Sequence, residues 1–80
     1  MQKNMALTEH LYNIIYDVVR VKKSNRRGLC YACLCVDILP VLELEYSRYE
    51  VETAIESLLW SGRIEYKATG NDWLFRPKER

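Results

Sequence analysis

Apolar residues recur at helical spacing in the first quarter of the chain. The repeating positions are Leu7, Leu11, Ile14, Ile15 and Val18. Residues three and four apart share one face of an α-helix. Thr8 is suited to cap such a helix with its side-chain oxygen, and Lys22 and Lys23 are suited to its negative end. The pattern predicts a helix from about Thr8 to residues 21–23, followed by a polar loop over 24–28.

The next apolar segment, residues 29–44, admits more than one interpretation. Residues 29–36 form a short apolar run that fits a buried strand or a buried helix, and the apolar pattern that continues to Leu39 slightly favours helix. Pro40 has no amide hydrogen and costs about 3 kcal/mol deep inside a helix. Either a helix from the start of the segment stops at Leu39, or a helix capped by Asp37 carries Pro40 in its first turn. Both alternatives end in a helix.

A third helix has clear signals at both ends. The sequence Ser47-Arg48-Tyr49-Glu50 fits the S-x-x-E capping box, in which two side chains satisfy the first amides of a helix. The apolar residues that follow at helical spacing are Val51, Ala54, Ile55, Leu58 and Leu59. Gly62 is placed to end the helix as its left-handed cap.

A β-hairpin is predicted directly after this helix. Residues 63–67 alternate between polar and apolar, as a half-buried strand does. Residues 68–72 are a turn cluster, and Trp73-Leu74-Phe75 form a second strand that Pro77 closes. The whole pattern describes an α+β, mainly α domain over 1–80, with an ordered core of about 7–77.

The unit from Ser47 to the hairpin resembles the recognition helix and wing of winged helix-turn-helix domains. In that family a leucine-rich helix, a glycine and an isoleucine lead into the wing, as Leu58-Leu59, Gly62 and Ile64 do here. The resemblance covers residues 37–77 well and the first helix loosely. It implies a winged helix, with a three-helix core and a C-terminal β-hairpin wing.

The resemblance implies a function in binding double-stranded DNA. In that family the second helix of the motif enters the major groove, and the wing touches the flanking backbone or minor groove. The candidate contacts are Arg26 and Arg27 in the first loop, Arg48, Tyr49 and Thr53 on the exposed helix face, and Arg63 and Lys67 on the wing. This describes a small transcriptional regulator that reads two half-sites as a homodimer, of a kind that suits a phage, virus or plasmid.

The first helix is our candidate dimer surface, because Tyr12, Tyr16 and Val19 widen its apolar face. Most other aromatic side chains are expected in the core and the hairpin. Trp60, near a helix end, is the best candidate for a partly exposed anchor at an interface.

Charge along the chain gives a second functional hypothesis. The net charge is +1, but residues 37–65 hold seven acidic and two basic side chains, whereas both flanks are basic. Glu50, Glu52 and Glu56 lie on or near the exposed helix face, where they repel phosphates that DNA binding must neutralise. The basic loop and wing are then left to hold DNA. The alternative is a winged-helix protein-interaction module whose acidic third helix meets a partner with a basic surface.

The remaining chemistry predicts neither an enzyme nor a cofactor. Cys30, Cys33 and Cys35 favour core packing over a metal site or a disulfide, because zinc commonly takes four ligands and His10 lies on another element. No activated nucleophile or glycine-rich phosphate loop is visible. With no export signal and no membrane-spanning run, we expect an intracellular, cytoplasmic protein with free thiols.

Overall fold

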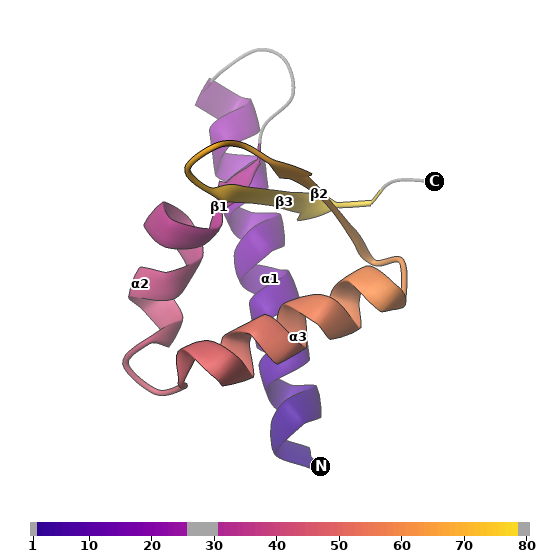
Figure 1. The fold of residues 1–80 in the computed structure, drawn as a ribbon. Coiled ribbons are helices and arrows are strands. Elements are labelled where there is room, and N and C mark those ends of the chain that lie inside the picture. The colour runs from indigo at the N-terminus through magenta and orange to yellow at the C-terminus, as the bar shows by residue number, and fades with distance from the viewer. Residues whose placement is uncertain (1, 26–30, 79–80) are drawn as a thin grey trace.

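The computed structural model describes residues 2–25 and 31–78, and the side chains of 6–23 and 31–78. The element order is α1 (Gln2–Asn25), β1 (Ala32–Cys33), the π-helical segment η1 (Leu34–Ile38), α2 (Leu39–Leu42), α3 (Arg48–Trp60), β2 (Ile64–Ala68) and β3 (Trp73–Pro77) (Figure 1). The strands form an antiparallel sheet in the order β1-β3-β2. The predicted fold class is confirmed: an α+β, mainly helical winged-helix layout with a C-terminal hairpin.

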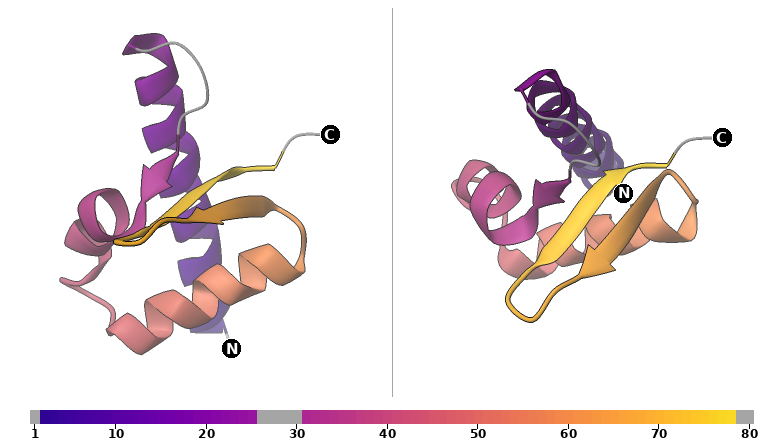
Figure 2. Two further views of the ribbon diagram at one scale, coloured as in Figure 1. Left: turned by 45° about the horizontal axis from the view of Figure 1, so that its top comes forward. Right: turned by 90° about the horizontal axis from the view of Figure 1, so that it is seen from above.

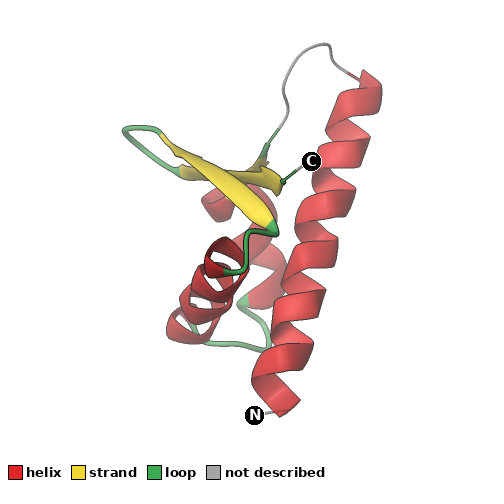
Figure 3. Cartoon of the chain, turned by 90° about the vertical axis from the view of Figure 1, so that its right-hand side faces the viewer, coloured by secondary structure: helices red, strands yellow, loops and turns green. Residues whose placement is uncertain are grey.

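The long helix α1 stands along one side of the domain, and α3, the η1–α2 segment and the sheet lie on the other side (Figure 3). The buried core residues are Leu7, Leu11, Ile15, Val19, Ala32, Leu34, Ile38, Leu39, Leu42, Val51, Ala54, Ile55, Leu58, Ile64 and Phe75. Those of α1 repeat every four residues, and those of α3 follow the same helical spacing, so the two helices pack one apolar face against the other.

In the first half of the chain one prediction is wrong, and one choice left open by the sequence is decided against the slightly favoured helix. The helix α1 begins at Gln2, so Thr8 lies inside it and does not cap it. Ala32 and Cys33 form a short strand and not part of a helix, because they pair antiparallel with the hairpin strand β3. Ala32 is fully buried there, opposite Phe75. A strand of two residues has no periodicity to detect, and only its partner defines it.

Pro40 sits in the first turn of α2, where it disturbs no interior hydrogen bond of that helix. The helical path nevertheless begins earlier, at Leu34, through the wider turn η1. Asp37 therefore lies within η1 and does not cap the helix α2 that carries Pro40. Both alternatives were right that a helix precedes residue 45. The one in which the helix stops at Leu39 is wrong, and the one that carries Pro40 in a first turn is right except for its cap, which is Ile38.

Asp37 instead joins α1 to the sheet. Its carboxylate accepts hydrogen bonds from the Lys22 ammonium at 2.8 Å and from the Cys33 amide at 2.8 Å. The same ammonium donates to the Tyr31 carbonyl at 2.8 Å. Both charged side chains are partly buried, so these bonds hold the end of α1 against β1 and η1.

The tip of the hairpin is held against η1 by Asp72. Its carboxylate accepts the Cys35 amide at 3.2 Å and the Trp73 amide at 2.7 Å. The Cys35 amide lies in the first turn of η1, where helical amides lack a partner in their own helix. Asp72 thus supplies a cap from a distant part of the sequence and orients the wing.

The predicted boundaries of α3 are confirmed. The Ser47 side chain accepts the Glu50 amide at 3.1 Å, and the Glu50 carboxylate accepts the Ser47 amide at 2.9 Å. At the other end, Gly62 has a φ of 77°, and its amide donates to the Leu59 carbonyl at 3.1 Å. This left-handed turn redirects the chain from α3 into β2.

Replacement of Gly62 by alanine is expected to lower the free energy of unfolding by about 1–2 kcal/mol. A Cβ at this position meets nothing within 4 Å, so the cost comes from the left-handed backbone and not from a clash. Gly70→Ala is the matched control, since its Cβ also meets nothing and its φ is not in that region. Urea denaturation of both variants measures the effect. An equal loss in both would contradict the left-handed cap as its cause.

Candidate functional site

The outward face of α3 carries the side chains on which both functional hypotheses depend. All five residues predicted to be exposed there are exposed: Arg48, Tyr49, Glu52, Thr53 and Glu56. Four residues lie along one line of the helix, at positions 49, 53, 56 and 60, because steps of three and four residues return to the same face. Glu52 lies beside this line. We call Tyr49, Glu52, Thr53, Glu56 and Trp60 the α3 stripe.

Aromatic side chains stand at the two ends of the α3 stripe. Trp60 is 89% exposed and Tyr49 is 77% exposed, although large aromatic side chains usually bury most of their surface. Trp60 follows Tyr49 by eleven positions, which is about 16 Å along the helix axis. The sequence indicated Trp60 as a candidate for a partly exposed anchor and predicted the exposed face, but did not place Trp60 on that face. Steps of three and four residues from Tyr49 lead to Trp60, and this spacing would have placed Trp60 on the exposed face.

Carboxylates lie between the two aromatic ends. Glu52 accepts a hydrogen bond from Arg48 at 3.1 Å, one turn away, and both side chains are more than half exposed. An ion pair this exposed contributes little energy. Glu56 has no ion-pair partner among the described residues. The α3 stripe with Arg48 therefore carries one positive and two negative charges.

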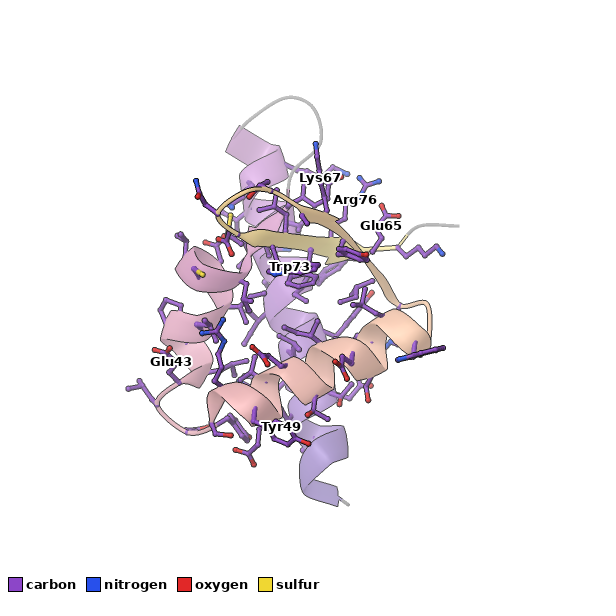
Figure 4. All side chains as sticks on the ribbon, in the orientation of Figure 1. Glu43, Tyr49, Glu65, Lys67, Trp73 and Arg76 are labelled. Atoms are coloured by element: carbon purple, nitrogen blue, oxygen red, sulfur yellow. The ribbon has the colours of Figure 1, made fainter. Side chains whose placement is uncertain are left out.

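Acidic charge continues into the turn before α3. Glu43 and Glu45 are exposed there, and so is Leu44, because α2 ends at Leu42 and leaves residue 44 outside the helix. Glu43 lies beside α2 (Figure 4). The exposed surface from α2 through α3 is thus acidic and bears uncovered apolar side chains.

Arg63, a candidate DNA contact, is held by α1. Its guanidinium pairs with the Glu9 carboxylate through two hydrogen bonds, at 2.5 and 3.2 Å, and lies 4.3 Å from the centre of the Tyr12 ring. The hydrogen bond from Arg63 holds the pKa of Glu9 below its usual value. Arg63 precedes β2 and so joins α1 to the base of the wing.

Lys67 lies on the wing with its side chain exposed. It points away from α3, from the same side of the sheet as Glu65 and Arg76, which form an ion pair across the two strands (Figure 4). Tyr49 points away from the wing at the opposite side of the view. The predicted contacts on the wing and on α3 therefore do not converge on one basic surface, and Arg26 and Arg27 lie outside the described residues.

The predicted dimer surface on α1 is largely used within the chain. Val19 is buried in the core, and Tyr12 is partly buried beneath Arg63. Tyr16 alone of the three is exposed, with its ring stacked on Tyr12 at 6.4 Å. The expectation that these side chains widen an external apolar face is wrong for Val19.

The two described cysteines are not core residues as predicted: Cys33 is partly buried and Cys35 is exposed, while Cys30 lies outside the described residues. Burial raises the pKa of Cys33, and the interaction with Asp72 raises that of Cys35. Both thiols are therefore protonated at neutral pH and are not activated nucleophiles. Within 2–25 and 31–78, no group of three or more His, Cys, Asp or Glu side chains is placed to hold a metal ion.

No helix in the described ranges is both long enough and apolar enough to cross a membrane. Comparison of the chain with known protein families, with curated proteins and with solved structures finds no match.

Proposed function

We propose that this chain is a winged-helix protein-interaction module whose α3 stripe binds a basic segment of another protein. The carrying observation is the stripe itself, on which two exposed aromatic side chains flank two carboxylates. Exposed aromatic residues of this kind are typical anchors of protein interfaces. The winged-helix fold alone assigns no function, because one fold serves many sites.

The charge of the stripe favours a protein partner over DNA at this surface. Affinity for DNA depends on positive side chains that neutralise phosphates and release counterions. Arg48 offers one positive charge, while Glu52 and Glu56 offer two negative ones. A basic protein segment reverses this balance, since each carboxylate then gains a charged partner in place of a phosphate that repels it.

The dimensions of the stripe describe the partner. Two apolar side chains of the partner, spaced by about 16 Å, match Tyr49 and Trp60. Arginine or lysine between them matches the two carboxylates, and an arginine can also stack on the exposed indole. A basic amphipathic helix of three turns meets these requirements.

A displayed library of amphipathic peptides tests this proposal. Selection on the wild-type protein is expected to enrich peptides with Arg or Lys between two apolar positions. Recovered peptides should lose tenfold or more in affinity on the double variant Glu52→Lys/Glu56→Lys and on Trp60→Ala, because each removes part of the stripe. Isothermal titration calorimetry measures both losses.

Asp17→Lys is the matched control, since it reverses an exposed carboxylate on α1, away from the stripe. It should bind the recovered peptides as the wild type does. Recovered peptides that bind all variants equally would contradict the proposal.

DNA binding is the second candidate function, and the winged-helix layout with Lys67 exposed on the wing favours it. In this proposal the chain is a regulator of the winged helix-turn-helix family, and the wing and first loop hold a duplex. A gel-shift assay with a mixed-sequence duplex at low salt tests it. Binding should fall steeply with salt and weaken on every sequence when Arg26 and Arg27 are neutralised together. A function in DNA binding implies the intracellular location that the sequence predicts.

A further inference from the structure

The strand β2 is a free edge of the sheet in the described part of the chain. Among residues 2–25 and 31–78, the order β1-β3-β2 leaves β2 with one neighbour, and the view from above shows no other helix or strand beside it in the plane of the sheet (Figure 2). A free edge presents unpaired backbone groups that can pair with another strand.

The hydrogen bonds at the two ends of the hairpin determine which backbone groups of β2 are unpaired. The Thr69 backbone amide donates to the Asp72 carbonyl at 2.9 Å, and the Lys78 backbone amide donates to the Arg63 carbonyl at 2.9 Å. Bonded and non-bonded pairs alternate along an antiparallel ladder. The backbone groups at odd positions from 63 to 69 therefore face β3, and those of residues 64, 66 and 68 face outward.

We propose that a second copy of this chain pairs along β2 in an antiparallel ladder, with its two-fold axis at Tyr66. Tyr66 then lies opposite Tyr66 of the partner subunit, and Ile64 lies opposite Ala68 of the partner subunit. Every outward backbone group of β2 meets another outward group, so all five residues of the strand take part and the two hairpins form one continuous sheet.

The charges on β2 complement each other in this register. Glu65 lies opposite Lys67 of the partner subunit, and the two-fold axis repeats the pair. These are the non-bonded positions of the new ladder, where opposing side chains approach most closely. Charged side chains usually keep an exposed edge from pairing, but here the opposing charges have opposite signs. Glu65 already pairs with Arg76, so the new contacts extend an existing row of charges.

The other face of the sheet gains an aromatic cluster. The Tyr66 and Trp73 rings lie 5.3 Å apart on the face that also carries Phe75, and both are about half exposed. The two-fold axis places the two Tyr66 rings beside each other, and each keeps the Trp73 ring of its own chain at its outer side. This contact is independent of the α3 stripe, which lies on another element, and it replaces α1 as our candidate dimer surface.

Sedimentation equilibrium and amide hydrogen exchange test the dimer. The apparent mass should rise from one chain to two with concentration, with the weak affinity of a small interface. At high concentration the amides of Ile64, Tyr66 and Ala68 should gain protection, whereas those of Glu65 and Lys67 should be protected already in the monomer. A chain that stays monomeric at millimolar concentration would overturn the proposal.

Charge variants identify the register. Lys67→Glu and Glu65→Lys should each weaken self-association tenfold or more, because each puts like charges opposite one another. An equimolar mixture of the two variants should associate again, since every opposing pair then has opposite signs. Tyr66→Pro removes an outward amide and leaves the internal ladder intact, so it should abolish the dimer. A dimer that survives all these changes contradicts the β2 interface.

Discussion

Replacement of Phe75 by alanine is expected to remove about 3–5 kcal/mol from the free energy of unfolding. Phe75 is 2% exposed and lies on β3, the central strand, between Ala32 on β1 and Tyr66 on β2. Truncation leaves a cavity where the sheet meets the helices. A domain of 80 residues has a total stability of about 4–12 kcal/mol, so this one change removes a quarter or more of it and, at the lower end of that range, unfolds the domain.

Urea denaturation followed by circular dichroism measures this loss. Trp60→Ala is the matched control, because it also truncates a large aromatic side chain, but one that is 89% exposed. Its free energy of unfolding should stay within about 0.5 kcal/mol of the wild type. A loss below about 1 kcal/mol for Phe75→Ala would show that the sheet does not pack as described.

The second half of the fold was predictable because its signals are local. The capping box at Ser47 and Glu50 and the left-handed Gly62 specify the boundaries of α3 within a few residues of sequence. The alternation over 63–67 and the turn cluster after it specify the hairpin. Each of these devices depends on neighbours in the chain, so a sequence pattern contains it.

The first half depends on distant partners. The strand β1 exists because Phe75 and Leu74 pair with it, more than 40 residues away. Asp72 caps η1 from the hairpin, 37 residues away from Cys35. No local pattern encodes such contacts, so the sequence left both strand and helix open for residues 32 and 33, and the slight preference for helix was wrong there.

The same difference applies to the candidate site. Helical periodicity was sufficient to predict which face of α3 is exposed, because the apolar residues mark the buried face. No sequence pattern could predict the ion pair of Arg63, because its partner Glu9 is 54 residues away. Net charge along the sequence showed an acidic middle segment, but only the fold placed Trp60 in line with Tyr49 and left Leu44 uncovered. The positions of these two exposed apolar side chains are the reason that we propose a protein partner before DNA.

The two proposed surfaces have different consequences for function. The α3 stripe lies on a helix and the dimer edge lies on β2, so one chain can use both at once. A dimer through β2 then presents two stripes, and a partner with two basic segments gains affinity from the second contact. The affinity for a peptide with two basic segments should be higher at protein concentrations at which the dimer forms than at those at which the chain is monomeric. Equal affinities would mean that the two stripes bind independently.

Replacement of Asp37 by asparagine is expected to lower the free energy of unfolding by about 2 kcal/mol at pH 7. The asparagine still accepts from the Cys33 amide, but the partly buried Lys22 ammonium loses its counter-charge. Asp17→Asn is the control, because its pair with Arg20 at 3.7 Å is exposed and contributes little.

The pH dependence of this loss identifies its cause. Burial alone raises the pKa of Asp37, but the hydrogen bonds from Lys22 and the Cys33 amide, with the charge of Lys22, outweigh it and hold the pKa below its ordinary value. A lowered folded-state pKa stabilises the protein above the unfolded value of about 3.9, and this stabilisation is lost as the pH falls through the folded value. Urea denaturation should thus show a constant difference between wild type and Asp37→Asn above about pH 5, shrinking below about pH 4. A difference that persists undiminished at low pH would mean that the carboxylate charge is not what joins α1 to the sheet.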